Sequence, residues 1–149
     1  MTGLQPLGGK FAIKTHLKGT YLTAVGGGGR TTDVIHTDAL APQAWETFTV
    51  WVDDAQQNYA FQTENGHFIT TVNDGGMTSD AIHSDATSIQ AWEMFRLVPQ
   101  LQSGTLAIQT QKGFFLTAVG GGGLNSGETI HTDATRAQEW EFYNIVPIP

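Results

Sequence analysis

Apolar and polar residues alternate along short stretches of this chain, and no stretch keeps the 3.6-residue apolar period of an amphipathic helix. In "FAIKT" the alternation places Phe11 and Ile13 on one face, and in "FTV" it does the same for Phe48 and Val50. "TYLTAV" and "DVIHTDA" are further short runs of β-forming residues, and Gly, Asn, Asp and Pro stand between the runs. The pattern predicts an all-β protein built of short strands.

The whole pattern occurs three times. The copies read "FAIKTHLKGTYLTAVGGGGRTTDVIHTDALAPQAWETFTV", "YAFQTENGHFITTVNDGGMTSDAIHSDATSIQAWEMFRLV" and "LAIQTQKGFFLTAVGGGGLNSGETIHTDATRAQEWEFYNIV". Intervals of 47 and 48 residues separate both the repeated tryptophans and the repeated histidines, which are Trp45, Trp92, Trp140, His36, His83 and His131. We therefore expect a single domain over residues 1–149, with repeats at about 9–52, 58–98 and 105–146.

Four strands in each repeat give about twelve strands. Propellers contain four to eight blades, so three repeats favour a closed barrel with pseudo-three-fold symmetry, in which no sheet edge is left open. A chain of 149 residues is long enough to bury a core without disulfides, and it contains no cysteine.

Each repeat ends in Gln-x-Trp, as in Gln43-Ala44-Trp45, followed by an aromatic residue such as Phe48. This resembles the Q-x-W signature of ricin-type β-trefoils, and the start of "GTYLTAV" resembles fascin-like trefoil domains. The segment "GTYLTAVGGGG…VIHTDA" is also similar to mussel-type galactose-binding trefoil lectins, whose repeats carry G-K-F-L-H-P-x-G-G and L-H-x-D-x-H. The resemblance implies a β-trefoil. We expect its three repeated tryptophans to lie in the core.

Runs of four glycines are costly, about 0.5–1 kcal/mol for each residue in regular structure, so they indicate a loop with positive φ or close backbone approach. In the mussel-type lectins the corresponding Gly-Gly turn lets backbone amides approach a sugar, while the downstream His and Asp bond its hydroxyls. That resemblance makes the following residues candidate ligand contacts: Gly26, Gly27, Gly28, Gly29, His36, Asp38, Asn73, Asp74, Gly75, His83, Asp85, Gly120, Gly121, Gly122, Gly123, His131 and Asp133.

The chain also departs from those lectins. Thr23, Thr70 and Thr117 replace the first histidine of the lectin motif, and the last histidine of L-H-x-D-x-H is absent from all three repeats. His-Thr-Asp is therefore open to a second interpretation, in which each Asp caps a turn and each His bonds the backbone. Carboxylates also follow each repeated tryptophan, and their recurrence beside it predicts structural hydrogen bonds for Glu46, Glu93 and Glu141.

The formal net charge of −7 argues against nucleic acid and against anionic membrane surfaces, which both require clustered basic residues. No apolar run is long enough for a signal peptide or a membrane span, so we expect a cytoplasmic protein, with non-classical release left open. Two polar side chains per repeat are too few for a zinc site, and no phosphate-binding lysine follows the glycines. We expect neither a metal nor a cofactor.

Polar groups that recur in equivalent positions favour repeated binding over one asymmetric catalytic centre, so we do not expect an enzyme. The preferred function is a lectin with up to three shallow sites for galactose- or mannose-type glycans. A protein-binding trefoil remains an alternative, either as a protease inhibitor or as a non-covalent companion subunit of another protein. A protein partner or a homo-oligomer is left open. A fascin-like actin cross-linker is disfavoured because actin is acidic.

Overall fold

The computed structural model describes residues 3–101 and 103–148, which form thirteen β-strands and six 3-10 helices of three residues each. Twelve strands follow the three predicted repeats, and the additional strand β1 precedes the first repeat and pairs with β5. The strands are β1 (Gln5–Pro6), β2 (Lys10–Thr15), β3 (Tyr21–Ala24), β4 (Ile35–Ala39), β5 (Thr49–Val52), β6 (Tyr59–Gln62), β7 (Phe68–Thr71), β8 (Ile82–Ala86), β9 (Phe95–Gln100), β10 (Thr105–Thr110), β11 (Phe115–Ala118), β12 (Ile130–Ala134) and β13 (Phe142–Ile148). The helices are η1 (Val25–Gly27), η2 (Ala44–Glu46), η3 (Val72–Asp74), η4 (Ala91–Glu93), η5 (Val119–Gly121) and η6 (Glu139–Glu141).

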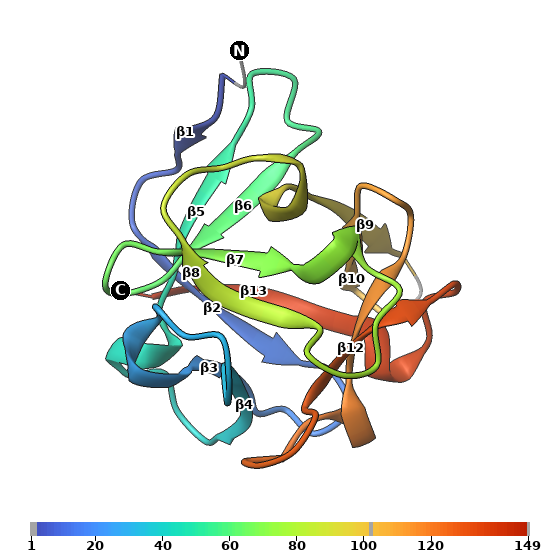
Figure 1. The fold of residues 1–149 in the computed structure, drawn as a ribbon. Helices are drawn as coiled ribbons and strands as arrows, with labels where there is room; N and C mark the ends of the chain where they lie inside the picture. The colour runs from blue at the N-terminus through green and yellow to red at the C-terminus, as the bar shows by residue number, and fades with distance from the viewer. Residues whose placement is uncertain (1–2, 102, 149) are drawn as a thin grey trace.

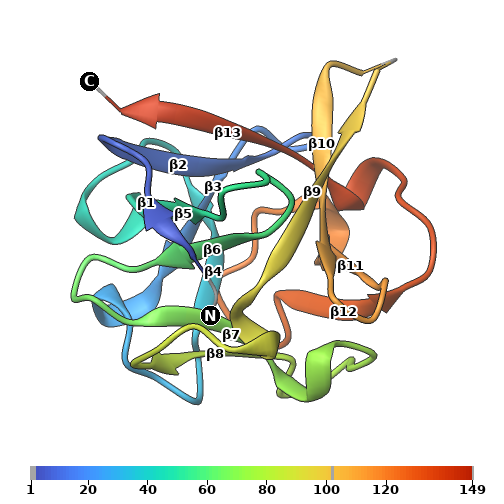
Figure 2. The ribbon, with the colours of Figure 1, turned by 90° about the horizontal axis from the view of Figure 1, so that it is seen from above.

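Six strands, β2, β5, β6, β9, β10 and β13, close into an antiparallel barrel (Figure 1). Strands of neighbouring repeats pair along most of their length. β13 runs beside β2 with Tyr143 opposite Thr15 and Ile148 opposite Lys10 (Figure 2). The first and last strands of one repeat meet more briefly, and Phe11 and Phe48 exchange two backbone hydrogen bonds there. Closure of this kind leaves no long open edge for another strand.

Three hairpins close one end of the barrel: β3 with β4, β7 with β8, and β11 with β12. Each contains the same bulge, because Tyr21 pairs with Ala39 while Thr23 pairs with His36. The extra residue in one strand bends the hairpin, as β-bulges generally do. Barrel, hairpins and repetition together make the fold a β-trefoil.

The core consists of three-fold sets of apolar side chains. Phe48, Phe95 and Tyr143 are at most 1% exposed, and they lie three residues after the repeated tryptophans. Around them pack three further sets, with one member from each repeat: Ile13, Phe61 and Ile108; Leu22, Ile69 and Leu116; Ile35, Ile82 and Ile130. Burying one such side chain stabilises a fold by about 1.5–3 kcal/mol.

The prediction that the repeated tryptophans form the core is wrong. Trp45, Trp92 and Trp140 are 47%, 42% and 45% exposed. Each is the middle residue of a 3-10 helix whose last residue is a buried glutamate, Glu46 in the first repeat. A 3-10 helix has three residues per turn, so neighbouring side chains diverge by about 120°. Because the glutamate points inward, the tryptophan is turned to the surface.

Across residues 3–101 and 103–148, no helix is both long and apolar enough to cross a membrane.

Candidate functional site

The glycine loops adopt backbone conformations that other residues rarely take. Gly26, Gly27, Gly28 and Gly29 have φ values of 69°, 80°, 106° and 84°. The run from Gly120 to Gly123 repeats these values within 5°. Positive φ explains why glycine occupies these positions, as the sequence predicted.

Close approach also constrains the third glycine of each loop, and the partner is the next repeat. A β-carbon on Gly28 would overlap the hydroxyl of Thr63 and lie 2.8 Å from Asn65 Oδ1. The equivalent atom on Gly75 would lie 3.1 Å from Thr110, and on Gly122 it would lie 2.8 Å from Thr20 Oγ1. The glycines therefore let each loop pack against the first hairpin of its neighbour.

The amides of the last two glycines in the first loop are donated inside the protein. Gly28 donates to the carbonyl oxygen of Val25 at 3.2 Å, and Gly29 donates to that of Ser84 at 2.6 Å. In the third loop Gly122 and Gly123 donate in the same way. The amides of the last two glycines in each run are therefore not available to a ligand.

The first half of the loop lies against an exposed indole. A β-carbon on Gly27 would be 3.6 Å from Cδ1 and 3.7 Å from Nε1 of Trp45. The helix that carries the tryptophan packs on the helix of the glycine loop in all three repeats. Sequence reasoning missed the tryptophans as site residues. The signal was the glutamate that directly follows each tryptophan, with the buried aromatic three residues after it.

In the second repeat Asp74 occupies the position of Gly27, with a φ of 63°. Its Oδ1 is buried and has no hydrogen-bond partner among the described residues. Asn73, at the position of Gly26, has a φ of 58° and directs its amide to Met77 Sδ at 3.5 Å. The surroundings of Trp92 therefore differ from those of the other two tryptophans.

The structural role predicted for the repeated glutamates is confirmed. Glu46 accepts from the hydroxyl of Thr23 at 2.6 Å and from the amide of Gln43 at 2.8 Å. Glu93 and Glu141 make the same two bonds with their own repeats. Burial, and next the charge of Glu141, raise the pKa of the fully buried Tyr143 well above its usual value. The bonded threonines, which replace the first histidine of the lectin motif, are themselves buried.

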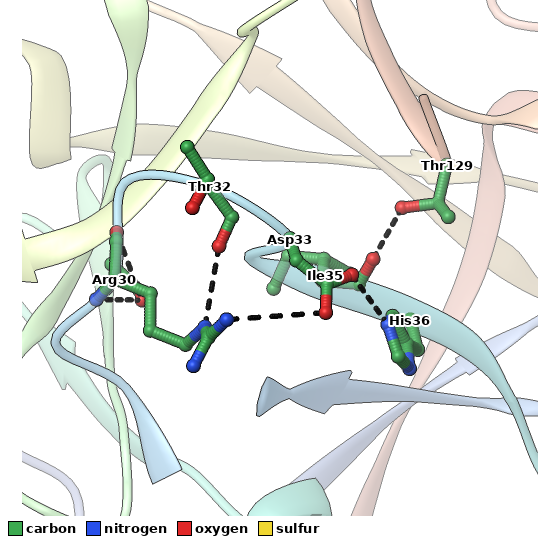
Figure 3. A network of polar contacts seen from close by, with 7 residues as sticks. Arg30, Thr32, Asp33, Ile35, His36 and Thr129 are labelled. Carbon is green, nitrogen blue, oxygen red and sulfur yellow. Dashed lines mark hydrogen bonds and ion pairs between the residues drawn. The ribbon is translucent and has the colours of Figure 1, made fainter. Parts of the chain in front are cut away.

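The repeated histidines lie half-buried on the outer hairpins. His36 is the register partner of Thr23, so both side chains face the side of the hairpin that holds Glu46. Its Nε2 lies 2.7 Å from Asp33 Oδ1, and Arg30 approaches the same carboxylate at 3.9 Å (Figure 3). The carboxylate that contacts the imidazole therefore comes three residues before the histidine.

The second repeat copies this contact, and the third does not. His83 Nε2 lies 2.8 Å from Asp80 Oδ1. In the third repeat, Glu128 stands three residues before His131, and its Oε1 accepts from the amide of Asp80 in the neighbouring repeat. Asp38 is half-buried, whereas Asp85 and Asp133 are exposed. Each of these aspartates falls in or beside the bulge of its hairpin.

The structure therefore assigns the predicted residues to different surroundings. Gly27 lies beside Trp45, His36 bonds Asp33 on the outer hairpin, and Gly28 and Gly29 serve the contact between repeats. Among the described residues, no three His, Cys, Asp or Glu side chains gather closely enough to hold a metal ion.

The fold defines the class of the protein as a β-trefoil, and known structures agree. The designed three-fold symmetric protein ThreeFoil superposes with a TM-score of 0.76 at 12% identity, over 93% of this chain and 99% of that one. The Rhizoctonia solani agglutinin gives 0.73 at 14% identity, over 94% and 95%. SeviL, solved with asialo-GM1 saccharide, gives 0.68 at 13% identity, over 95% and 98%.

Residues 7–141 match the family DUF7910, a domain of unknown function. The chain therefore belongs to that family. None of the curated protein sequences matches the chain.

Proposed function

We propose that this protein is a non-catalytic carbohydrate-binding protein with one shallow site in each repeat, centred on Trp45, Trp92 or Trp140. The observation that carries the proposal is the repeated exposure of an indole beside a glycine loop. Tryptophan is enriched at binding surfaces, because its ring offers a large apolar face and its N–H a polar contact. The apolar face of a pyranose ring is a suitable partner for it.

Polar groups on the outer hairpin next to the tryptophan's helix would supply the hydrogen bonds that a sugar requires. His36 lies on β4 of this hairpin, and Asp38 follows it by two residues on the same strand. Because Nε2 of His36 already bonds Asp33, its Nδ1 and the Asp38 carboxylate are the groups that can each bond a sugar hydroxyl. His131 and Asp133 are the equivalents at the third site, and His83 and Asp85 at the second.

Lectins among the structural neighbours support the same class of ligand. The Rhizoctonia solani protein is an agglutinin, and SeviL was solved with a saccharide bound. Shallow sites bind single sugars weakly, typically with millimolar dissociation constants, and three sites on one rigid fold raise the apparent affinity on clustered glycans. We accordingly expect galactose- or mannose-type glycans to be bound when they are presented in clusters.

Catalysis forms no part of this proposal. The buried glutamates beside the tryptophans each accept two hydrogen bonds from their own repeat, so we assign them to the scaffold.

A glycan array of the purified protein tests the proposal, followed by titration of the best glycan. Trp45→Ala combined with Trp140→Ala should lower apparent affinity by at least tenfold, because two stacking surfaces are lost and avidity multiplies the effect. Leu7→Ala is the control, since Leu7 is 40% exposed but precedes the repeats. Absence of glycan binding, or equal losses in the control, would contradict the proposal.

Asp38→Asn with Asp133→Asn forms a second arm. It should weaken glycan binding by roughly ten- to hundredfold per site, which is the effect of losing a charge-assisted hydrogen bond. Thermal stability should change little. A lower melting temperature with unchanged binding would instead assign these aspartates to the scaffold.

A further inference from the structure

A cavity of about 500 Å³ lies where the three repeats meet, at the loops that precede β4, β8 and β12. Equivalent residues of all three repeats line it, so it surrounds the pseudo-three-fold axis. We call it the axial cavity. It is distinct from the tryptophan sites, whose indoles are not part of its lining. Its volume falls within the range of small-molecule sites, about 300–1,000 Å³.

The lining of the axial cavity combines an apolar base with an acidic mouth. Ile35, Ile82 and Ile130 contribute from the buried ends of the three strands. Asp33, Asp80 and Glu128 contribute from the exposed loops. A ligand in this cavity would therefore meet apolar side chains at one end and carboxylates at the other.

The carboxylates are only partly neutralised by the protein. Asp33 and Asp80 each hold a histidine Nε2 through Oδ1, and Glu128 accepts a backbone amide through Oε1. Arg30 reaches Asp33 at 3.9 Å, but neither Lys nor Arg belongs to the cavity lining. A concave surface with one sign of charge concentrates its field on a bound ion.

The shape of the axial cavity argues for an organic cation and against a metal ion. A metal requires several oxygen ligands within about 2.0–2.6 Å, and the described carboxylates and histidines form no such group. The cavity is also many times larger than an ion, and its isoleucine base has no ligand atoms to offer. A molecule with an apolar body and a positive end matches both parts of the lining.

We propose that the axial cavity binds a small organic ammonium ligand, with its charge between Asp33 and Asp80 and its apolar body on the isoleucines. The proposal does not depend on the tryptophans, although His83 belongs both to the cavity lining and to the second proposed sugar site.

Benzylamine is a suitable probe because it carries a primary ammonium on an aromatic ring. Benzyl alcohol is its neutral counterpart of nearly the same shape. We expect benzylamine to shift the methyl NMR signals of Ile35, Ile82 and Ile130 with a millimolar dissociation constant, and benzyl alcohol to bind at least fivefold more weakly. Equal binding of both probes, or no shift of these methyls at about 20 mM benzylamine, would overturn the proposal.

Charge-removing variants complete the test. Asp33 and Asp80 have φ values of 49° and 51°, a region that asparagine tolerates as well as aspartate, so Asp33→Asn and Asp80→Asn should preserve the loops. Each should weaken benzylamine binding about fivefold, the upper range for a half-exposed ion pair, and leave benzyl alcohol unaffected. Asp54→Asn makes the same change of charge outside the cavity lining and should have no effect. If Asp54→Asn weakened benzylamine binding equally, the effect would come from net charge alone, and the proposed site would be refuted.

Discussion

Gly29 and Ser84 join the first repeat to the second: the amide of Gly29 donates to the carbonyl oxygen of Ser84 at 2.6 Å. The amide of Ser84 returns a bond to the carbonyl oxygen of Arg30 at 2.9 Å. The same pair of bonds links the second repeat to the third, and the third to the first. The glycine loops therefore connect neighbouring repeats through backbone hydrogen bonds. This role does not depend on what the adjoining surface binds.

Substitution of a glycine in such a loop should lower the stability of the fold. Gly28→Ala should lower the free energy of unfolding by about 2–4 kcal/mol, because the new methyl group meets Thr63 and Asn65 and the backbone φ of 106° is unfavourable for alanine. Gly66→Ala is the matched control, since its φ of 91° is also positive but nothing lies within 4 Å of the new atom. It should cost only about 1 kcal/mol. Urea unfolding of both variants measures the difference, and equal losses would contradict the packing argument.

The second prediction concerns how much the exposed tryptophans contribute to stability. Phe95→Ala should cost about 3–5 kcal/mol because Phe95 is fully buried, whereas Trp92→Ala should cost about 1–2 kcal/mol because 42% of Trp92 is exposed. Chemical denaturation of the two variants measures both losses of stability. If Trp92→Ala were the more damaging change, the tryptophan would belong to the core after all.

Tyr143 should make the protein sensitive to alkali. Burial raises the pKa of its hydroxyl above the ordinary value of 10.0, so its contribution to stability is complete below pH 10 and is lost as the pH rises further, when only the unfolded chain ionises. Tyr143→Phe should cost about 1 kcal/mol at pH 8, through loss of the 3.1 Å bond to the carbonyl oxygen of Leu116. The phenylalanines at the equivalent positions 48 and 95 show that the ring is accommodated.

Urea unfolding of both proteins at pH 8 and pH 10.5 tests this prediction. The advantage of the tyrosine should shrink or reverse at the higher pH. An unchanged difference would mean that the hydroxyl ionises as readily in the folded protein as in the unfolded chain.

Asp53 should have the opposite pH dependence. The amide of Gln57, and next the side chain of Asn58, donate to its carboxylate at 2.8 Å and lower its pKa. A lowered pKa stabilises the folded state above the ordinary aspartate pKa of about 4, and the contribution is lost as the pH falls through the lowered value. Between pH 5 and pH 2, Asp53→Asn should therefore lose less stability than the unsubstituted protein.

Thermal unfolding across this pH range measures the effect. Asp54→Asn, one residue further along, is the control for the change in net charge. If both variants reduce the loss of stability at low pH equally, the hydrogen bonds of Asp53 are not the cause of that loss.

Much of this fold could be predicted from repetition and alternation. The alternating runs defined the strands because each strand buries one face, and three copies of four strands implied closure about an axis. The repeated glutamates were also predictable, since a carboxylate that recurs beside the same residue in every repeat serves the scaffold. The addition of β1 was not predictable, because "QP" shows no alternation and gains its pairing only from β5.

The candidate site was harder to predict because its residues are divided between two roles. Four consecutive glycines gave no sign that Gly28 faces Thr63 while Gly27 faces Trp45. The sequence paired His36 with Asp38 through strand alternation, but a bulge lies between them and the observed partner is Asp33. Such distinctions depend on contacts between repeats, which local pattern does not record.

The pairing of β13 with β2 has a consequence for how this molecule could be built. Because the last strand lies against the first along six residue pairs, the path of the backbone around the barrel forms a ring, interrupted at one boundary between equivalent units. Cutting at another such boundary, in the turn of residues 53–58, and joining the present ends with a linker long enough to span from β13 to β1 would preserve every strand pairing. Such a circular permutant, beginning with the present second unit, should reach the same native structure.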